Sequence, residues 1–103
     1  MKVYISGPVT GIKDDNEPAF KKAEIVLKKM GHKPINPVQL CKDAGLTEWH
    51  ACMNIICIPA LKDCDMMVLL DGWENSKGAN VEIDEARLND IPVIKLEKLN
   101  ELI

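Results

Sequence analysis

The sequence predicts a single Rossmann-like α/β domain over residues 1–103, with three layers and a parallel sheet of about four strands. Short β-branched runs alternate with longer amphipathic segments, which favours right-handed crossovers between parallel strands. The run Asp65–Leu70 is apolar on both faces, as in a central strand that helices cover on both sides. A chain of 103 residues, 47% of them hydrophobic, supplies one core.

The first third of the chain is expected to form a strand, a loop and a helix. Lys2–Ser6 is a β-branched and aromatic run that Gly7 and Pro8 end with a turn. A polar loop then precedes a helix with Pro18 in its first turn and Gly31 as its left-handed cap. The buried stripe of this helix is expected to be Phe20, Ala23, Leu27 and Met30.

The remaining elements continue the alternation. His32–Val38 is predicted as a second strand, at the sheet edge because it contains two prolines. Thr47 is expected to cap a helix from Glu48 toward Lys62, which Pro59 kinks or splits. After the strand Asp65–Leu70, we expect a helix over residues 80–89, a strand over Ile91–Leu96 and a short helical tail in the last residues.

This topology places the first and third strands in the centre, and ligands bind beyond the carboxyl ends of such strands. The loops expected there cover residues 6–11, 36–38 and 71–78. In the first loop, glycines and the hydroxyls of Ser6 and Thr10 suit an anion, although a tight structural turn needs similar residues.

The third loop offers further candidate contacts. Ser76 and Gly78 precede a helix N-terminus, where a phosphate can bind. Trp73 either offers a flat face to a base or sugar, or packs on its own domain or on a neighbouring subunit. Glu82 is predicted in the first turn of the helix, where the dipole favours an ionised carboxylate. That carboxylate either attacks an anomeric carbon or merely stabilises the helix at the surface.

Composition excludes several classes of protein. The net charge is −3 and Arg87 is the only arginine, so a nucleic acid is not an expected partner. The chain has no apolar run long enough for a membrane span and starts without an export signal, so we expect a cytoplasmic protein with no membrane partner. The spacing of the cysteines favours reduced thiols over a disulfide or a metal site. Their positions are Cys41, Cys52, Cys57 and Cys64.

Three motifs together resemble the nucleoside 2-deoxyribosyltransferase superfamily, and most closely its small DUF4406 branch. They are Tyr4-Ile5-Ser6-Gly7-Pro8, then Asn36-Pro37, and then Gly72-Trp73-Glu74 followed by Ser76-x-Gly78-Ala79-x-x-Glu82-x-x-x-Ala86. The resemblance covers nearly the whole chain. It implies a flavodoxin-like sheet, and cleavage of the N-glycosidic bond of a (deoxy)nucleoside or its 5′-monophosphate without a metal or an organic cofactor.

The resemblance also implies roles for individual residues. Glu82 matches the nucleophile and Tyr4 the tyrosine that orients it. Ser76 matches a serine that contacts the 5′-phosphate, which makes a nucleoside 5′-monophosphate the expected substrate. The sugar, phosphate and base are expected to contact Ser6, Gly7, Pro8, Thr10, Gly11, Asn36, Trp73, Ser76 and Gly78. Relatives complete their pockets with a neighbouring subunit, so a homo-oligomer, at least a dimer, is expected.

One position departs from the superfamily pattern. Cys57 lies where the family has an aspartate that handles protons, and a thiol is mostly neutral at pH 7. Either Asp71 or Glu74 supplies the proton, or activity is weak or absent. The sequence therefore leaves an N-glycosidase or deoxyribosyltransferase as the leading hypothesis. The alternatives are a nucleotide-binding or partner-binding module that has lost the chemistry, and a purely structural subunit.

Overall fold

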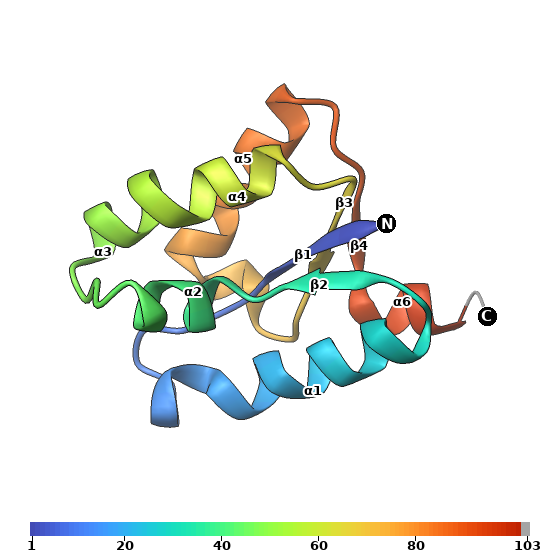
Figure 1. Cartoon of the computed structure of the whole chain (residues 1–103), viewed down its shortest axis with the longest axis horizontal. Helices are drawn as coiled ribbons and strands as arrows, with labels where there is room; N and C mark the ends of the chain where they lie inside the picture. The colour runs from blue at the N-terminus through green and yellow to red at the C-terminus, as the bar shows by residue number, and fades with distance from the viewer. Residues whose placement is uncertain (102–103) are drawn as a thin grey trace.

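Four parallel strands form the sheet of the computed structural model, which describes the backbone of residues 1–101 and the side chains of residues 1–99 (Figure 1). The strand order is β2-β1-β3-β4, so the first and third strands are central, as predicted. The strands are β1 (Lys2–Ser6), β2 (Lys33–Ile35), β3 (Met66–Leu69) and β4 (Val93–Lys95).

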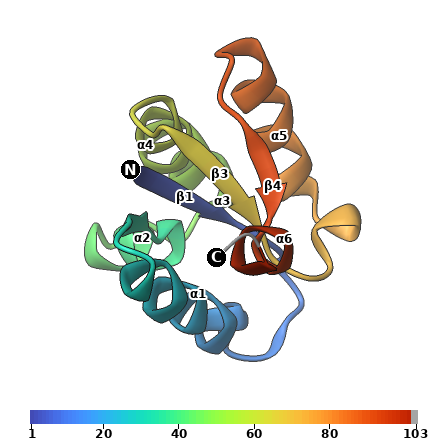
Figure 2. The ribbon, with the colours of Figure 1, turned by 90° about the vertical axis from the view of Figure 1, so that its right-hand side faces the viewer.

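Helices cover both faces of the sheet and make the three predicted layers (Figure 2). Helices α1 (Glu17–Lys29) and α6 (Leu96–Glu101) pack on one face, against Val3 and Ile5 of β1. The other face carries α4 (Ile58–Lys62) and α5 (Lys77–Leu88). Because side chains alternate along a strand, Tyr4 and Ser6 point toward this second face.

Helix α1 confirms the prediction for its buried stripe. Phe20, Ala23 and Leu27 are almost fully buried, and Met30 is half-buried. Gly31 has a φ of +85°, and the following N–H, from His32, donates to the carbonyl of Leu27 at 3.0 Å. This left-handed turn ends the helix where the sequence predicted.

The second strand is shorter than predicted, because Asn36 begins a helix that the sequence analysis missed. β2 ends at Ile35, and α2 (Pro37–Asp43) follows at once. Val38, expected in a strand, is therefore helical. β2 does lie at the edge of the sheet, with Pro34 as its middle residue.

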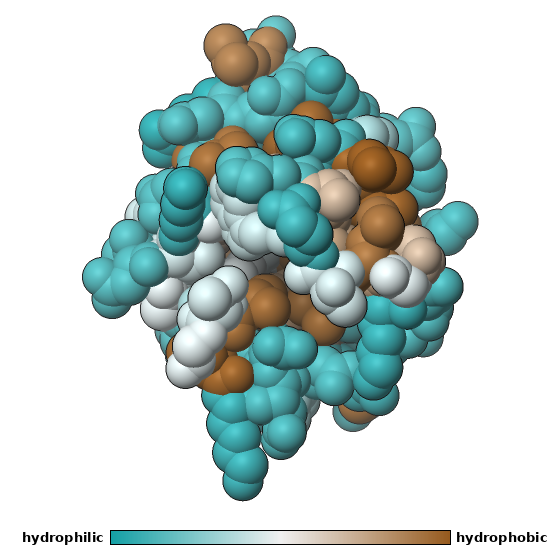
Figure 3. Space-filling view, turned by 90° about the vertical axis from the view of Figure 1, so that its left-hand side faces the viewer, coloured by the Kyte–Doolittle hydropathy of each residue, from teal (hydrophilic) through white to brown (hydrophobic). Residues whose placement is uncertain are grey.

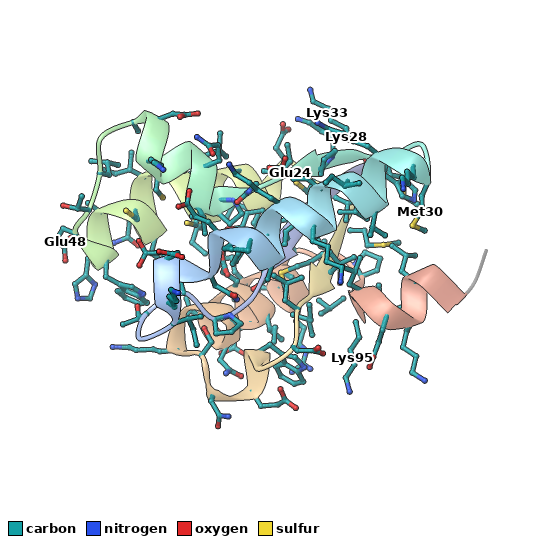
Figure 4. All side chains as sticks on the ribbon, turned by 90° about the horizontal axis from the view of Figure 1, so that it is seen from below. Glu24, Lys28, Met30, Lys33, Glu48 and Lys95 are labelled. Atoms are coloured by element: carbon teal, nitrogen blue, oxygen red, sulfur yellow. The ribbon has the colours of Figure 1, made fainter. Side chains whose placement is uncertain are left out.

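The expected helix from Glu48 toward Lys62 is interrupted, as predicted, but its cap is wrong. Glu48, not Thr47, accepts hydrogen bonds from the N–H groups of His50 and Ala51, at 3.1 and 2.7 Å. Glu48 lies at the start of α3 (Trp49–Ala51), far from Glu24 of α1 (Figure 4). The interruption is a π-helical segment, and Pro59 lies in the first turn of the next helix. The pieces are α3 (Trp49–Ala51), the π segment (Cys52–Cys57) and α4.

The last third of the chain follows the prediction with shifted boundaries. Helix α5 begins at Lys77 rather than at residue 80, and β4 is shorter than Ile91–Leu96. α6 is the predicted helical tail, of which residues 102–103 lie outside the described part. A short 3₁₀ turn lies at Trp73–Asn75, and Lys13–Asn16 is a tight turn in which Asp14, Asp15 and Asn16 have left-handed φ angles of +55°, +53° and +60°. Within residues 1–101, none of the helices has the length and apolar character needed to cross a membrane.

Candidate active site

Tyr4, Ser6 and Glu82 form a buried polar cluster at the carboxyl end of β1. The hydroxyl of Ser6 donates to Oε1 of Glu82 at 2.8 Å, and the hydroxyl of Tyr4 donates to Oε2. Tyr4 and Ser6 are fully buried, and Glu82 is 5% exposed. The glutamate that the sequence singled out therefore points into the domain, toward the strand end predicted for ligands.

The start of α5 explains how Glu82 reaches this position. Ser76 is the N-cap, and its Oγ accepts from the N–H of Ala79 at 3.1 Å. Since α5 begins at Lys77, Glu82 lies in the second turn and faces inward with Ile83 and Ala86, which are also buried. The prediction that Glu82 lies in the first turn, where the helix dipole would favour its charge, is therefore wrong.

Burial controls the charge of Glu82. Loss of hydration raises the pKa of Glu82 to about 7, although the hydrogen bonds from Tyr4 and Ser6 favour the ionised form and act in the opposite direction. The pKa of Tyr4 lies well above its ordinary value, first because Tyr4 is buried and then because Glu82 is near. At neutral pH the carboxyl thus exchanges readily between its two protonation states, while Tyr4 keeps its proton.

Cys57 is a buried thiol of the core around Tyr4. It is 7% exposed and belongs to the same apolar cluster as Tyr4. Burial, followed by the charge of Glu82, raises the pKa of the Cys57 thiol to about 11. All four cysteines are free thiols in this structure, with Cys57 and Cys64 buried, and the sulfur of Cys41 lies 3.9 Å from that of Cys57. Among the described residues, no three His, Cys, Asp or Glu side chains are placed to hold a metal ion.

The loop after β1 contributes mainly close backbone packing. A Cβ at position 7 would lie 2.8 Å from the Cβ of Leu70, so Gly7 allows β1 and β3 to end side by side. Pro8 lies against Gly72, where an added Cβ would be 3.3 Å from the proline Cγ. The loops after β1 and β3 therefore meet beside the cluster.

Thr10 and Gly11 lie farther along the first loop and are exposed. Gly11 has a φ of +81°, which explains the glycine as a turn residue. The Thr10 hydroxyl makes no hydrogen bond to the Tyr4–Ser6–Glu82 cluster, and Gly11 has no side chain to offer. The structure therefore does not place these two residues with Glu82.

Two tryptophans flank the start of α5, and only Trp73 was expected there from the sequence. Trp73 is half-buried and packs against the apolar cluster of Tyr4, which agrees with packing on its own domain for part of the ring. Trp49, on α3, was missed. A Cβ at Gly78 would lie 3.6 Å from the indole Nε1 of Trp49, and the ammonium of Lys77 lies 4.9 Å from the centre of the indole ring.

Both the oxygen and the nitrogen of the Asn36 side-chain amide make hydrogen bonds that stabilise the fold. Its carbonyl oxygen accepts from the N–H groups of Val38 and Gln39, at 3.1 and 3.3 Å. Its NH₂ group donates to Glu24 of α1 at 2.8 Å. None of these hydrogen bonds joins Asn36 to the Glu82 cluster, so its side chain acts as a helix cap in this structure.

The two acids expected as alternative proton donors do not join the cluster. Asp71 lines a cavity of about 410 Å³ on the opposite face of the sheet, together with Leu70 and Lys22. Glu74 is exposed in the 3₁₀ turn. Neither acid is among the groups that shift the pKa of Glu82.

Figure 3 shows the side of the molecule toward which β1 and β2 run, with residues of intermediate and apolar hydropathy in its middle and hydrophilic residues around them.

The fold and the cluster define a small α/β domain in which a titratable carboxyl, that of Glu82 on α5, faces the end of the central strand β1. Residues 1–95 match the model of the family described as "Domain of unknown function (DUF4406)", and the chain belongs to that family. No curated protein matches the chain.

Proposed function

We propose that this protein cleaves the N-glycosidic bond of a (deoxy)nucleoside 5′-monophosphate, or of a nucleoside, with Glu82 as the nucleophile. The observation that carries the proposal is the inward carboxyl of Glu82, held by the hydroxyls of Tyr4 and Ser6 at the carboxyl end of β1. The resemblance of the Ser76–Ala86 motif to the nucleoside 2-deoxyribosyltransferase superfamily supplies the reaction class.

The two hydrogen bonds leave the carboxylate able to react. An ionised carboxylate has about four lone-pair sites, and Tyr4 and Ser6 occupy two of them. A free lone pair attacks C1′ of the sugar, and the C1′–N bond breaks with its electron pair going to the base. Both donors hold the carboxyl in place during the attack, so little further rotational freedom of this side chain is lost in reaching the transition state.

Water completes the reaction. Among the residues whose side chains are described, the hydrogen-bond partners of Glu82 are Tyr4 and Ser6 and include no second carboxyl, so the departing base takes its proton from water, which leaves hydroxide. Hydroxide then attacks C1′ and breaks the bond to Glu82, giving a free base and a sugar or sugar phosphate. A second base in place of water would give transfer instead. Two inversions produce net retention at C1′.

The start of α5 is the proposed phosphate site. Ser76 uses an oxygen lone pair as the N-cap and keeps its hydroxyl proton as a donor, beside the N-terminal end of a helix of twelve residues. Lys77 adds a positive charge nearby. These features favour a nucleoside 5′-monophosphate over an uncharged nucleoside.

Incubation of the pure protein with a panel of deoxynucleoside 5′-monophosphates, followed by chromatography for free base, tests the proposal. We expect base release that Glu82→Gln lowers by at least about a thousandfold, since the nucleophile is removed. Glu74→Gln, which changes an exposed acid outside the cluster, is the control and should retain activity. Release that is unchanged in Glu82→Gln would refute the role of Glu82.

A binding module without chemistry is the second candidate, and one observation favours it. Glu82 is 5% exposed, with both carboxyl oxygens already hydrogen-bonded inside the domain, and the position of the family's aspartate holds Cys57. This candidate predicts saturable nucleotide binding by calorimetry, with no base released over days.

We propose a homo-oligomer as the working form, and a cytoplasmic location. Ile55 on the π segment and Val81 on α5 are exposed apolar residues, at 61% and 37%, that a second copy can cover. Light scattering during size-exclusion chromatography tests the assembly. A monomer at micromolar concentration would contradict it.

A further inference from the structure

Two thiols from different helical elements are in contact, next to the core cluster that contains Tyr4. The sulfur of Cys41, on α2, lies 3.9 Å from the sulfur of Cys57, at the end of the π segment. A disulfide bond is about 2 Å long, so the two sulfurs have to approach each other by roughly 2 Å to form one. A sulfur swings through such a distance when its side chain rotates about the Cα–Cβ bond. The two thiols therefore lie within bonding reach of each other.

The surroundings of the four cysteines differ. Cys57 is 7% exposed and Cys41 is half-buried, so a small oxidant in the solvent reaches Cys41 more easily. Cys52 donates to the carbonyl of Leu46 and Cys64 donates to that of Ala60, both at 3.2 Å. These two thiols are directed at backbone oxygens, whereas Cys41 and Cys57 are directed at each other.

We propose that Cys41 and Cys57 form a redox-sensitive modification site, in which hydrogen peroxide oxidises the two thiols to a reversible disulfide that joins α2 to the π segment. This chemistry uses no nucleotide and is independent of the proposed function. Disulfides that form in a reducing compartment are usually transient and serve catalysis or redox sensing.

The oxidation proceeds in two steps. Cys41 loses its proton, its sulfur attacks one oxygen of the peroxide, and the O–O bond breaks to give a sulfenic acid and hydroxide. Cys57 loses its proton, its sulfur attacks the sulfur of Cys41, and the S–O bond breaks with release of a second hydroxide. The two protons neutralise the two hydroxides. Two thiols and one peroxide thus give one disulfide and two waters, and the two sulfurs supply the two electrons that reduce the peroxide.

Burial makes this oxidation slow at neutral pH. Loss of hydration, and next the charge of Glu82, raises the pKa of the Cys57 thiol to about 11. The pKa of Cys41 also lies well above its ordinary value, first because burial removes hydration and then because Cys57 is near. Since the thiolate is the reactive form, the pair is expected to respond to sustained rather than brief exposure to peroxide.

The disulfide restrains the segment between the two cysteines. They are 16 positions apart, and the segment carries Trp49, which lies beside Gly78 of α5. A cross-link removes conformational freedom mainly from the unfolded chain. The oxidised protein is therefore expected to unfold at a higher denaturant concentration than the reduced protein.

Mass spectrometry of the intact, fully reduced chain tests the proposal. The protein is treated with excess hydrogen peroxide at about pH 8 for several hours, and the remaining thiols are then blocked with N-ethylmaleimide. We expect the main product to be a single chain that has lost two hydrogens and carries two blocked thiols. Reduction with dithiothreitol should restore four thiols.

Serine variants identify the two sulfurs. Cys41→Ser and Cys57→Ser should each lower the rate of disulfide formation by at least about tenfold, because one partner is missing. Cys41→Ser changes a half-buried position, so it tests the pair even where Cys57→Ser weakens the fold. Cys64→Ser is the matched control, since Cys64 is as buried as Cys57 but donates to a carbonyl, and it should react at the wild-type rate.

Three results would overturn the proposal. They are a sulfenic or sulfinic acid on Cys41 that never proceeds to a disulfide, a disulfide that includes Cys52 or Cys64, and thiols that stay reduced in the folded chain under peroxide that oxidises the urea-unfolded chain. A protein that forms the expected disulfide but releases no base from nucleotides would refute the proposed function and leave the redox pair intact.

Discussion

The hydroxyl of Ser6 donates to Oε1 of Glu82 at 2.8 Å and so joins two residues 76 positions apart in the chain. Ser6 ends a central strand, and Glu82 comes from the second turn of α5, so both partners are fixed by buried elements. This bond favours the charged carboxyl, while burial favours the neutral one. The properties of the site therefore depend on which protonation state Glu82 has.

The rate of base release is expected to rise with pH through about 7. The pKa of Glu82 is about 7, and only the ionised carboxylate attacks. Tyr4→Phe removes a hydrogen bond that lowers this pKa, so the midpoint of kcat/KM should move to higher pH and the rate at pH 7 should fall roughly tenfold. Initial rates from pH 5 to 9 check this. A midpoint near pH 4.5, the ordinary value for a glutamate, would contradict the buried state of the carboxyl.

Stability is expected to fall as Glu82 ionises. The pKa of Glu82 is 4.5 unfolded and about 7 folded, so its contribution is fully present below pH 4.5 and is lost as the pH rises through 7. The difference corresponds to roughly 3 kcal/mol, or a Tm change on the order of 10 °C. Glu82→Gln should lack this fall, so thermal melts of the two proteins between pH 5 and 8.5 are the test. Parallel pH dependences would show that the carboxyl is hydrated in solution.

Gly7→Ala is expected to destabilise the fold by about 1–3 kcal/mol, since its Cβ would lie 2.8 Å from the Cβ of Leu70. Denaturant unfolding measures the change. The double variant with Leu70→Gly should lose less stability than the two single variants added together, because the opposing Cβ of Leu70 is gone. If the stability losses of the two single variants simply add, Gly7 is needed for its backbone conformation rather than for the space beside Leu70.

Asn36→Ala is expected to lower stability by about 1–2 kcal/mol and to leave the KM for nucleotide unchanged. The reason is that Asn36 caps α2 and donates to Glu24, and none of its hydrogen bonds reaches the Glu82 cluster. Asn36→Ser keeps a capping oxygen and should recover part of the stability. Thermal melts and initial rates check both effects. A large rise in KM with unchanged stability would return Asn36 to the substrate site.

The sequence predicted the layers and the central strands because these depend on local patterns. The run Met66–Leu69 is apolar on both faces, and the stripe of Phe20, Ala23 and Leu27 has the helical period. Helix α2 was missed although Asn36 and Pro37 are a cap and first-turn pair, because the apolar residues on either side favoured a strand.

The site was predicted only in part, since its geometry depends on contacts between distant elements. Glu82 and Tyr4 were identified by their motifs, but the pKa of Glu82 follows from burial, which no motif reports. Trp49 was missed because its position beside Gly78 depends on how α3 packs against α5. The small residue at position 78 was the one available signal of such a close approach.

Pro34 limits how this domain can aggregate. It is the middle residue of the outer strand β2, where the N–H of Lys33 is donated inward to the carbonyl of Met1 at 2.9 Å. The next backbone nitrogen along the strand faces outward, and as a proline it has no hydrogen to offer. A strand from another molecule therefore finds no N–H donor at the middle of this edge strand. The missing donor protects the domain against fibril growth from that edge of the sheet.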